Sequence, residues 1–246
     1  MSKQPKLILR ESCVNDLSGA WPVGRFVEMG AGTGHMTRIF LERGFYGACH
    51  DLGADSRHML RENLSYAGER MIVVNQLSEL TTESFDYLFA FEVLEHIEND
   101  GDVIREWMRY LKPGGRILVS VPAHQQKYGR SDELVGHVRR YEKKDLHALL
   151  SGAGADDIRI VNYGFPITEL TRGLSNRLIR DDHSYDQMTL EQRSILSAQA
   201  KPTIINKVLS RISGDLFTPF CRVQRWFYRF DLGDGYVATG IKHYAS

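Results

Sequence analysis

The chain has 246 residues, of which 42% are hydrophobic and 25% are charged, and its formal net charge at pH 7 is zero. These values are typical of a folded globular protein and argue against a disordered or fibrous chain. A chain of this length can bury one sizeable core. Because zero net charge provides no general attraction for nucleic acid or anionic lipid, we expect neither as the default partner.

Signals for targeting, membrane spanning and metal binding are weak. The N-terminal apolar stretch ends at Arg10 and is too short for a signal peptide. No segment approaches the roughly 18 apolar residues of a membrane-spanning helix, so we expect a cytoplasmic protein without a membrane span. Cys13, Cys49 and Cys221 form no CxxC pair and no Cys/His cluster with metal-ligand spacing. We therefore expect reduced thiols and no bound metal.

From residue 25 to 121, short apolar segments alternate with segments of helical periodicity, as in βαβ units around a parallel sheet. The expected strands are 25–29, 47–51, 71–75, 87–91 and 116–121, and the expected helices are 33–43, 56–67 and 102–110. Crossovers between parallel strands are almost always right-handed, so the C-terminal strand ends should share one edge. Ligands of open α/β sheets bind at that edge.

The second half begins with a polar stretch, 124–141, which we expect to lie outside the core, followed by a helix at 143–151. Further strands are expected at 157–163 and 235–242, with a mostly helical insertion, 168–230, between them. We expect one domain, 1–246, in which this insertion forms a lid that sets specificity.

The end of the insertion, 222–230, has helical periodicity. Its two expected faces are a basic one, with Arg222, Arg225 and Arg229, and an apolar one, with Val223, Trp226, Phe227 and Phe230. Packing of the apolar face on the core is the first interpretation. Contact with a membrane surface or with a second copy in a homodimer is the alternative.

A glycine-rich turn follows the first expected strand, with Gly30, Gly32 and Gly34. Such a turn before a helix lets a ligand approach the backbone closely. Asp51 follows about 20 residues later, the distance at which a carboxylate meets ribose hydroxyls in βαβ nucleotide folds. Glu28 adds a carboxylate, either for an adenosine ligand or for neighbouring backbone amides. His35 stands where the dinucleotide fingerprint has a glycine or alanine, which disfavours an NAD-dependent oxidoreductase.

Two further motifs follow in order, FDYLFAFEVLEHI at 85–97 and LKPGGRILVSVP at 111–122. Together with the glycine turn and Asp51, they resemble the class I S-adenosylmethionine-dependent methyltransferases, especially the small-molecule group related to ubiquinone and menaquinone biosynthesis. The resemblance covers residues 24–163. It implies an α/β fold with a doubly wound seven-stranded sheet, mostly parallel with an antiparallel last strand. It also implies S-adenosyl-L-methionine as cofactor and a small-molecule acceptor methylated on oxygen or nitrogen.

The resemblance also implies roles for single residues. The glycine turn would face the methionine and ribose parts of the cofactor, Asp51 would accept hydrogen bonds from the ribose, and Leu52 would lie beside the adenine. Asn75 or Gln76 stands where the group often has an acidic residue for the adenine amine. The expected cofactor-binding residues are Glu28, Gly30, Ala31, Gly32, Gly34, Asp51, Leu52, Asn75, Gln76, Phe91 and Glu92.

Three histidines are candidates for a general base, which would assist transfer to a hydroxyl acceptor. His124 directly follows the fifth expected strand, and His137 stands in GHVRRY, which resembles a motif of a subset of these enzymes. His96 belongs to the LEHI string, where the alternative is a structural role in orienting the helix.

Candidates for binding the acceptor are Tyr128, Arg140 and Tyr141. Arg139 and Arg140 could clamp a carboxylate or phosphate of the acceptor. Alternatively, they pair with Asp132 and Glu133 and hold the loop in place. Competing functions are an RNA methyltransferase, which needs a basic groove and stacking aromatic residues, and a noncatalytic nucleotide-binding partner subunit.

Overall fold

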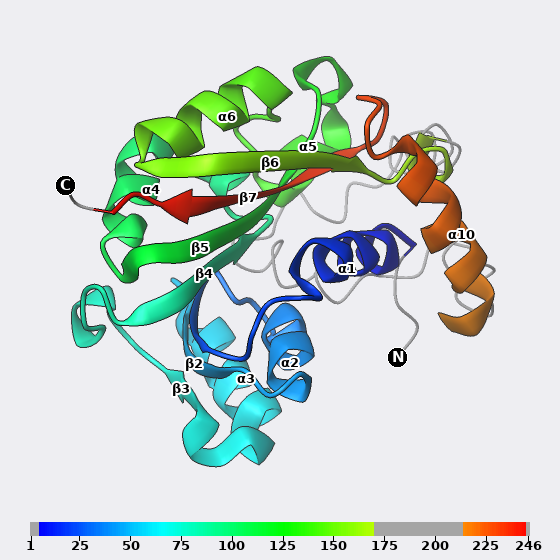
Figure 1. Ribbon diagram of the computed structural model, residues 1–246. Helices are drawn as coiled ribbons and strands as arrows, with labels where there is room; N and C mark the ends of the chain where they lie inside the picture. The colour runs from blue at the N-terminus through cyan, green and yellow to red at the C-terminus, as the bar shows by residue number, and fades with distance from the viewer. Residues whose placement is uncertain (1–4, 170–213, 245–246) are drawn as a thin grey trace. The chain divides into compact units, whose positions relative to one another are not determined.

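The computed structural model describes residues 5–169 and 214–244 (Figure 1). The chain divides into two compact units, each assembled from separate segments. The first unit comprises Met1–Ala20, Pro122–Lys143 and Val161–Val237, and the second comprises Trp21–Val121, Lys144–Ile160 and Ala238–Ser246. The single domain and the lid remain predictions, and residues 170–213 of the predicted lid lie outside the described residues.

Seven strands form one sheet in the order β3-β2-β1-β4-β5-β7-β6. Neighbouring strands from β3 to β5 are parallel, and the last strand, β7, is antiparallel. The predicted seven-stranded, mostly parallel sheet is therefore confirmed. The strands are β1 Arg25–Met29, β2 Tyr46–His50, β3 Met71–Val73, β4 Phe85–Phe91, β5 Leu111–Pro122, β6 Ala155–Tyr163 and β7 Gly235–Lys242.

Helices connect and flank these strands. The α-helices are α1 Pro5–Ser18, α2 His35–Glu42, α3 Ala54–Leu64, α4 Asp100–Met108, α5 Arg130–Val135, α6 Lys143–Gly152 and α10 Gly214–Phe227. Short 3₁₀ turns are η1 Ser65–Arg70, η2 Leu77–Glu79, η3 Leu94–His96 and η4 Gln125–Lys127. Within the described ranges, no helix combines the length and apolar character needed to cross a bilayer.

Aromatic side chains form the core of the second unit next to the glycine turn. Phe40 of α2 stacks on Phe89 of β4 with 4.1 Å between ring centroids, and Phe26 of β1 stacks on Phe89 at 5.2 Å. All three side chains are fully buried. Such ring contacts add to the free energy gained from removing large apolar surfaces from water. They fix α2, and with it the turn that precedes α2, against two neighbouring strands.

The predicted exposure of the polar stretch 124–141 is wrong in part. It contains the short helix α5, and Asp132, Leu134, Arg140 and Tyr141 are buried. Burial of such polar groups is tolerated because they bond to one another and to the backbone. The composition of the segment does not show that its polar groups form hydrogen bonds with one another.

The predicted faces of 222–230 also need correction. Trp226 is 75% exposed, whereas the polar Gln224 is buried. Gln224 Nε2 donates to Leu9 O of α1 at 2.9 Å, and Gln224 Oε1 accepts from Gly164 N at 3.2 Å. The helix α10 lies beside α1 (Figure 1). A hydrogen-bonded amide therefore replaces an apolar side chain in the contact, and the indole points outward.

Candidate functional site

The glycine turn between β1 and α2 has a backbone that few other residues adopt. Gly30, Gly32 and Gly34 have φ angles of 67°, 55° and 80°. Side-chain-bearing residues rarely adopt these angles, which explains the repeated glycine. A Cβ on Gly30 would lie 2.5 Å from Val93 Cγ2, while no atom lies within 4 Å of a Cβ built on Gly32. The turn is packed at its start and open at Gly32, so a ligand can approach the backbone there.

Asp51 joins this turn to the end of β2. Its Oδ2 accepts a hydrogen bond from Gly32 N at 2.8 Å, and its Oδ1 accepts one from Gly53 N at 3.1 Å. Ala31 N also donates to His50 O at 3.1 Å. The structure thus brings together the glycine turn and the carboxylate that sequence reasoning paired. Each carboxylate oxygen can accept more than one bond, so Asp51 retains capacity for ribose hydroxyls.

Glu28 is buried one residue before the end of β1, and its Oε2 accepts a hydrogen bond from Thr37 Oγ1 of α2 at 2.6 Å. This bond crosses beneath the glycine turn. It links the strand that enters the turn to the helix that leaves it. One role of Glu28 is therefore to hold the turn in shape.

Two arginines of α3 hold the loops after β2 and β3. Arg57 Nη1 donates to Asp51 O at 2.8 Å and to Leu52 O at 2.6 Å, while Arg61 Nη2 donates to Asn75 Oδ1 at 2.6 Å. The Leu52 side chain is 88% exposed. Bonds to its carbonyl fix this backbone and leave the apolar side chain available to cover a flat ring. Sequence reasoning missed both arginines, although their spacing of four residues places them on one helix face.

Glu79 is a further residue that sequence reasoning missed. Its Oε1 accepts hydrogen bonds from Asn75 N at 2.8 Å and Gln76 N at 2.7 Å. The side chain folds back over η2 in a capping arrangement with Gln76. An acidic group therefore does stand directly after β3. The spacing of three residues between Gln76 and Glu79 matches the capping box and was the available signal.

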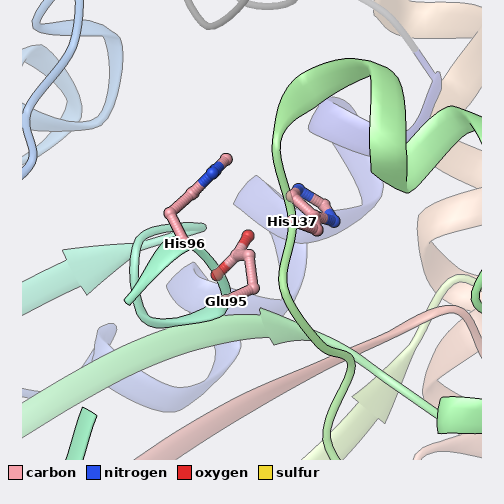
Figure 2. A group of neighbouring side chains, drawn as sticks. All are labelled: Glu95, His96 and His137. Carbon is pink, nitrogen blue, oxygen red and sulfur yellow. The ribbon is translucent and has the colours of Figure 1, made fainter. Parts of the chain in front are cut away.

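The segment after β4 turns sharply. Phe91 is buried, and Glu92 has a positive φ of 55°. Glu92 N donates to Ser120 O at 2.9 Å, and Ser120 Oγ donates to Glu92 Oε1 at 3.1 Å, so Glu92 is fastened to β5. Figure 2 shows Glu95 and His96 on the turn that follows. Glu95, which the sequence analysis did not select, is fully buried.

His124 belongs to the first unit and is held between two carboxylates. Its Nδ1 lies 3.6 Å from Glu142 Oε2, and its Nε2 lies 3.6 Å from Asp231 Oδ1. These distances exceed those of hydrogen bonds, and Nε2 has no hydrogen-bond partner among the described residues. The residue is 5% exposed and has a φ of 65°. Tyr236 OH donates to Asp231 Oδ1 at 2.6 Å and steadies that carboxylate.

His137, on the segment after α5 in Figure 2, also belongs to the first unit. Its Nδ1 lies 2.8 Å from Asp132 Oδ1. Because a carboxylate only accepts, this contact places the proton on Nδ1. Tyr128 OH donates to His137 O at 2.8 Å, so Tyr128 supports the same segment.

Arg140 is buried between two carboxylates. Its Nε donates to Asp132 Oδ1 at 2.9 Å, and its Nη1 donates to Asp234 Oδ1 at 3.0 Å and to Ala123 O at 3.2 Å. Of the two alternatives for this arginine, the geometry matches the one in which it holds the loop. Tyr141 lies beside it in sequence, is buried, and donates through its N to Pro122 O at 2.9 Å.

The charges of this cluster shift one another's proton affinities. Burial by itself would raise the pKa of Asp132, but the bond from His137 and the charge of Arg140 lower it overall. Burial would likewise raise the pKa of Asp234, which the charges of Lys6 and Arg140 lower. Burial lowers the pKa of Arg140, and the two carboxylates raise it overall. The cluster is therefore an ionised network at neutral pH.

A groove of about 410 Å³ lies between α1 and α10, within the first unit. Its walls include Glu11, Asp16, Arg222 and Arg225. None of the site residues predicted from the sequence lines this groove, so we do not assign it to the cofactor.

A comparison with known protein families finds a match over most of the segment from β1 to β5. Residues 27–119 match the family described as "Methyltransferase domain". This range contains the glycine turn, Asp51 and the motif after β4.

Curated relatives with sequence similarity include two ubiquinone biosynthesis O-methyltransferases. The protein of Aeromonas salmonicida is 25% identical over 117 residues, which cover 46% of this chain and 49% of the relative. The protein of Pseudomonas fluorescens is 30% identical over 101 residues, which cover 39% of this chain and 43% of the relative. The chain thus matches about half the length of these relatives.

Solved structures share the fold at low sequence identity. Phosphoethanolamine N-methyltransferase 2 of Haemonchus contortus, in complex with S-adenosyl-L-methionine, has a TM-score of 0.60 and 17% identity and covers 96% of this chain and 53% of its own. A possible histamine N-methyltransferase of Thermotoga maritima has a TM-score of 0.59 and 17% identity, with 97% and 91% covered.

Proposed function

Because the chain carries the domain of the class I S-adenosylmethionine-dependent methyltransferases, we propose that it methylates an oxygen of a small-molecule acceptor. The observation that carries the proposal is the hydrogen bond between Gly32 and Asp51, which forms an open turn beside a carboxylate. The relatives named as O-methyltransferases favour oxygen over nitrogen.

The residues of the second unit fit the cofactor. Its sulfonium supplies an already activated methyl group, so the chain has to bind, align and exclude water. Asp51 would accept from the ribose hydroxyls, the open backbone at Gly32 would admit the methionine and ribose parts, and Leu52 would cover the adenine. Phe91 and Glu92 would border the methionine end.

We assign recognition of the adenine amine to Glu79 in place of Asn75 or Gln76. The Oδ1 of Asn75 already accepts from Arg61, and the backbone amides of Asn75 and Gln76 are bound by Glu79 Oε1. Glu79 Oε2 makes no hydrogen bond to the described residues and can accept from an amine. A carboxylate suits this role because an amine donates and a carboxylate only accepts.

His124 is our first choice for the general base. Its buried Nε2 can take the proton that the acceptor hydroxyl loses as the oxygen gains the methyl group. Glu142 and Asp231, each 3.6 Å away, would stabilise the resulting imidazolium. His137 is the second choice, because Asp132 fixes its tautomer. His96 follows as the third candidate.

The first experiment is calorimetric titration with S-adenosylmethionine, S-adenosylhomocysteine and NAD. We expect both sulfur ligands to bind and NAD not to bind. Asp51→Ala should abolish measurable binding, whereas the matched control Asp55→Ala, on the exposed side of α3, should bind as the wild type does. A folded protein that binds neither sulfur ligand would refute the proposal.

The second experiment measures release of S-adenosylhomocysteine with phenolic, amine and RNA substrates. His124→Gln should lower kcat by about 100-fold to 10,000-fold, the range for loss of a general base, with unchanged affinity for the cofactor. Turnover with amines alone, or with RNA, would refute the proposal that the acceptor is an oxygen of a small molecule. Cofactor binding without turnover on any of them would favour the noncatalytic partner subunit.

A further inference from the structure

The outward side of α10 and the turn after it carry exposed apolar and basic side chains together. This surface, which we call the outer α10 face, consists of Trp226, Arg229, Phe230 and Leu232, with Arg222 at its edge, where Arg222 also lines the groove between α1 and α10. Trp226 is 75% exposed, Phe230 is 44% exposed and Leu232 is 46% exposed. Exposed groups of large apolar side chains in otherwise well-packed proteins mark sites of interaction.

The contacts on the opposite side show that this exposure is built into the fold. Arg225 donates to both carboxylate oxygens of Asp16 on α1, through Nε at 2.8 Å and Nη2 at 2.6 Å. Tyr228 OH donates to Asp16 Oδ2 at 2.9 Å, and Gln224 is bound to Leu9. These bonds fix the rotation of α10 about its axis. With Gln224 and Arg225 directed to α1, Trp226 has to point away from it.

The outer α10 face carries two arginines, and its one carboxylate, Asp231 between Phe230 and Leu232, accepts a hydrogen bond from Tyr236 OH. Arg225 is paired with Asp16, but Arg222 and Arg229 form no ion pair with the described residues. Both are exposed. Arg222 stands one helical turn before Trp226 on α10, and Arg229 follows in the turn after the helix, which ends at Phe227. Arg229 also lies over the Phe230 ring, at 5.0 Å from its centroid.

We propose that the outer α10 face binds the surface of an anionic lipid bilayer. An indole that is apolar in its body and polar at its N–H prefers the interface between headgroups and acyl chains. Arginines beside it bind lipid phosphates, and they complement a negative surface better than a protein surface without excess charge. The proposal goes beyond methyl transfer and does not depend on it.

Cosedimentation of the full chain with lipid vesicles tests this inference. We expect binding to vesicles of equal parts phosphatidylglycerol and phosphatidylcholine, weak binding to pure phosphatidylcholine, and weaker binding at high salt. Trp226→Ala should lower the partition coefficient about tenfold. Arg222→Gln and Arg229→Gln should each lower it about fivefold. Tyr66→Ala, which removes an exposed aromatic ring of the second unit, is the matched control and should bind normally.

Three outcomes would overturn the inference: no binding to either kind of vesicle, equal binding to both, or binding that the variants leave unchanged. Sedimentation velocity tests the main alternative, in which a second copy of the chain covers the outer α10 face. A dimer that Trp226→Ala converts to a monomer would assign the face to a second copy of the chain. Affinity for S-adenosylmethionine should stay at the wild-type value in every variant, which shows that each one is folded and keeps the readout separate from that of the proposed function.

Discussion

Arg140 offers a direct test of the ionised network in the first unit. Arg140→Ala leaves the buried carboxylates of Asp132 and Asp234 without their shared cation. Removing one partner of a buried ion pair typically costs about 3 to 5 kcal/mol of unfolding free energy. We expect about 3 kcal/mol, because Asp132 keeps its bond to His137 and Asp234 keeps Lys6 at 3.2 Å.

Urea unfolding followed by circular dichroism measures this loss. With an m value of about 3 kcal/mol/M, the midpoint should fall by about 1 M. Arg140→Lys should lose less, because an ammonium keeps the charge but cannot bridge both carboxylates. Arg130→Ala, which removes an exposed arginine of α5, should shift the midpoint by no more than about 0.2 M. If Arg140→Ala kept the wild-type midpoint and instead raised KM for the acceptor, the arginine would be a substrate clamp and our interpretation would be wrong.

Further outcomes follow from the turn, the network and the α1–α10 contact. Gly30→Ala should lower the urea midpoint more than Gly32→Ala, because only the former meets Val93, and equal losses would contradict this. Gly32→Ala should instead weaken cofactor binding in calorimetry, because its methyl group stands where the ligand approaches the backbone. The lowered pKa of Asp132 contributes stability that is present above its unfolded value of about 3.9 and is lost as pH falls through its folded value. In Asp132→Asn, the urea midpoint should therefore depend less on pH below about pH 4 than it does in the wild type. Parallel plots of midpoint against pH for the two proteins would exclude the effect. Gln224→Ala should cost about 1 to 3 kcal/mol in the same assay, because the buried N–H of Gly164 loses its acceptor, and an unchanged midpoint would show that water replaces the amide.

The sheet was largely predictable because its strands are short apolar segments with clear limits. The strands 25–29 and 235–242 were predicted to the residue. β5 begins at Leu111, five residues before the predicted start, although a Pro-Gly-Gly sequence usually indicates a turn. Leu111 pairs with Phe85, and a register shift follows before Tyr87. The residues between Leu111 and Arg116, which include both glycines, are accommodated by this register shift. Local sequence rules do not anticipate such a shift within a strand.

The cofactor site was predictable where one motif carries it, and it was not where distant groups meet. Gly32 and Asp51 are 19 residues apart, and a standard spacing relates them. Arg57 and Glu79 bind backbone atoms of loops. Every residue has these backbone atoms, so the sequence does not indicate which of them a side chain will bind. The helix α1 was missed because its buried residues, Leu9, Cys13 and Val14, form only a short stripe. Its partner helix is encoded 215 positions away from Leu9.

This separation has a consequence for synthesis on the ribosome. The helix α1 is synthesised before α10, and Gln224 and Arg225, which bind it, are added more than 200 residues later. At about 5 to 20 residues per second, the delay is roughly 10 to 40 seconds. During that time, the buried stripe of α1 has no native partner from α10, while residues 21–121 of the second unit are synthesised well before α10. Segment α1 therefore waits for its α10 partner while the intervening residues are synthesised.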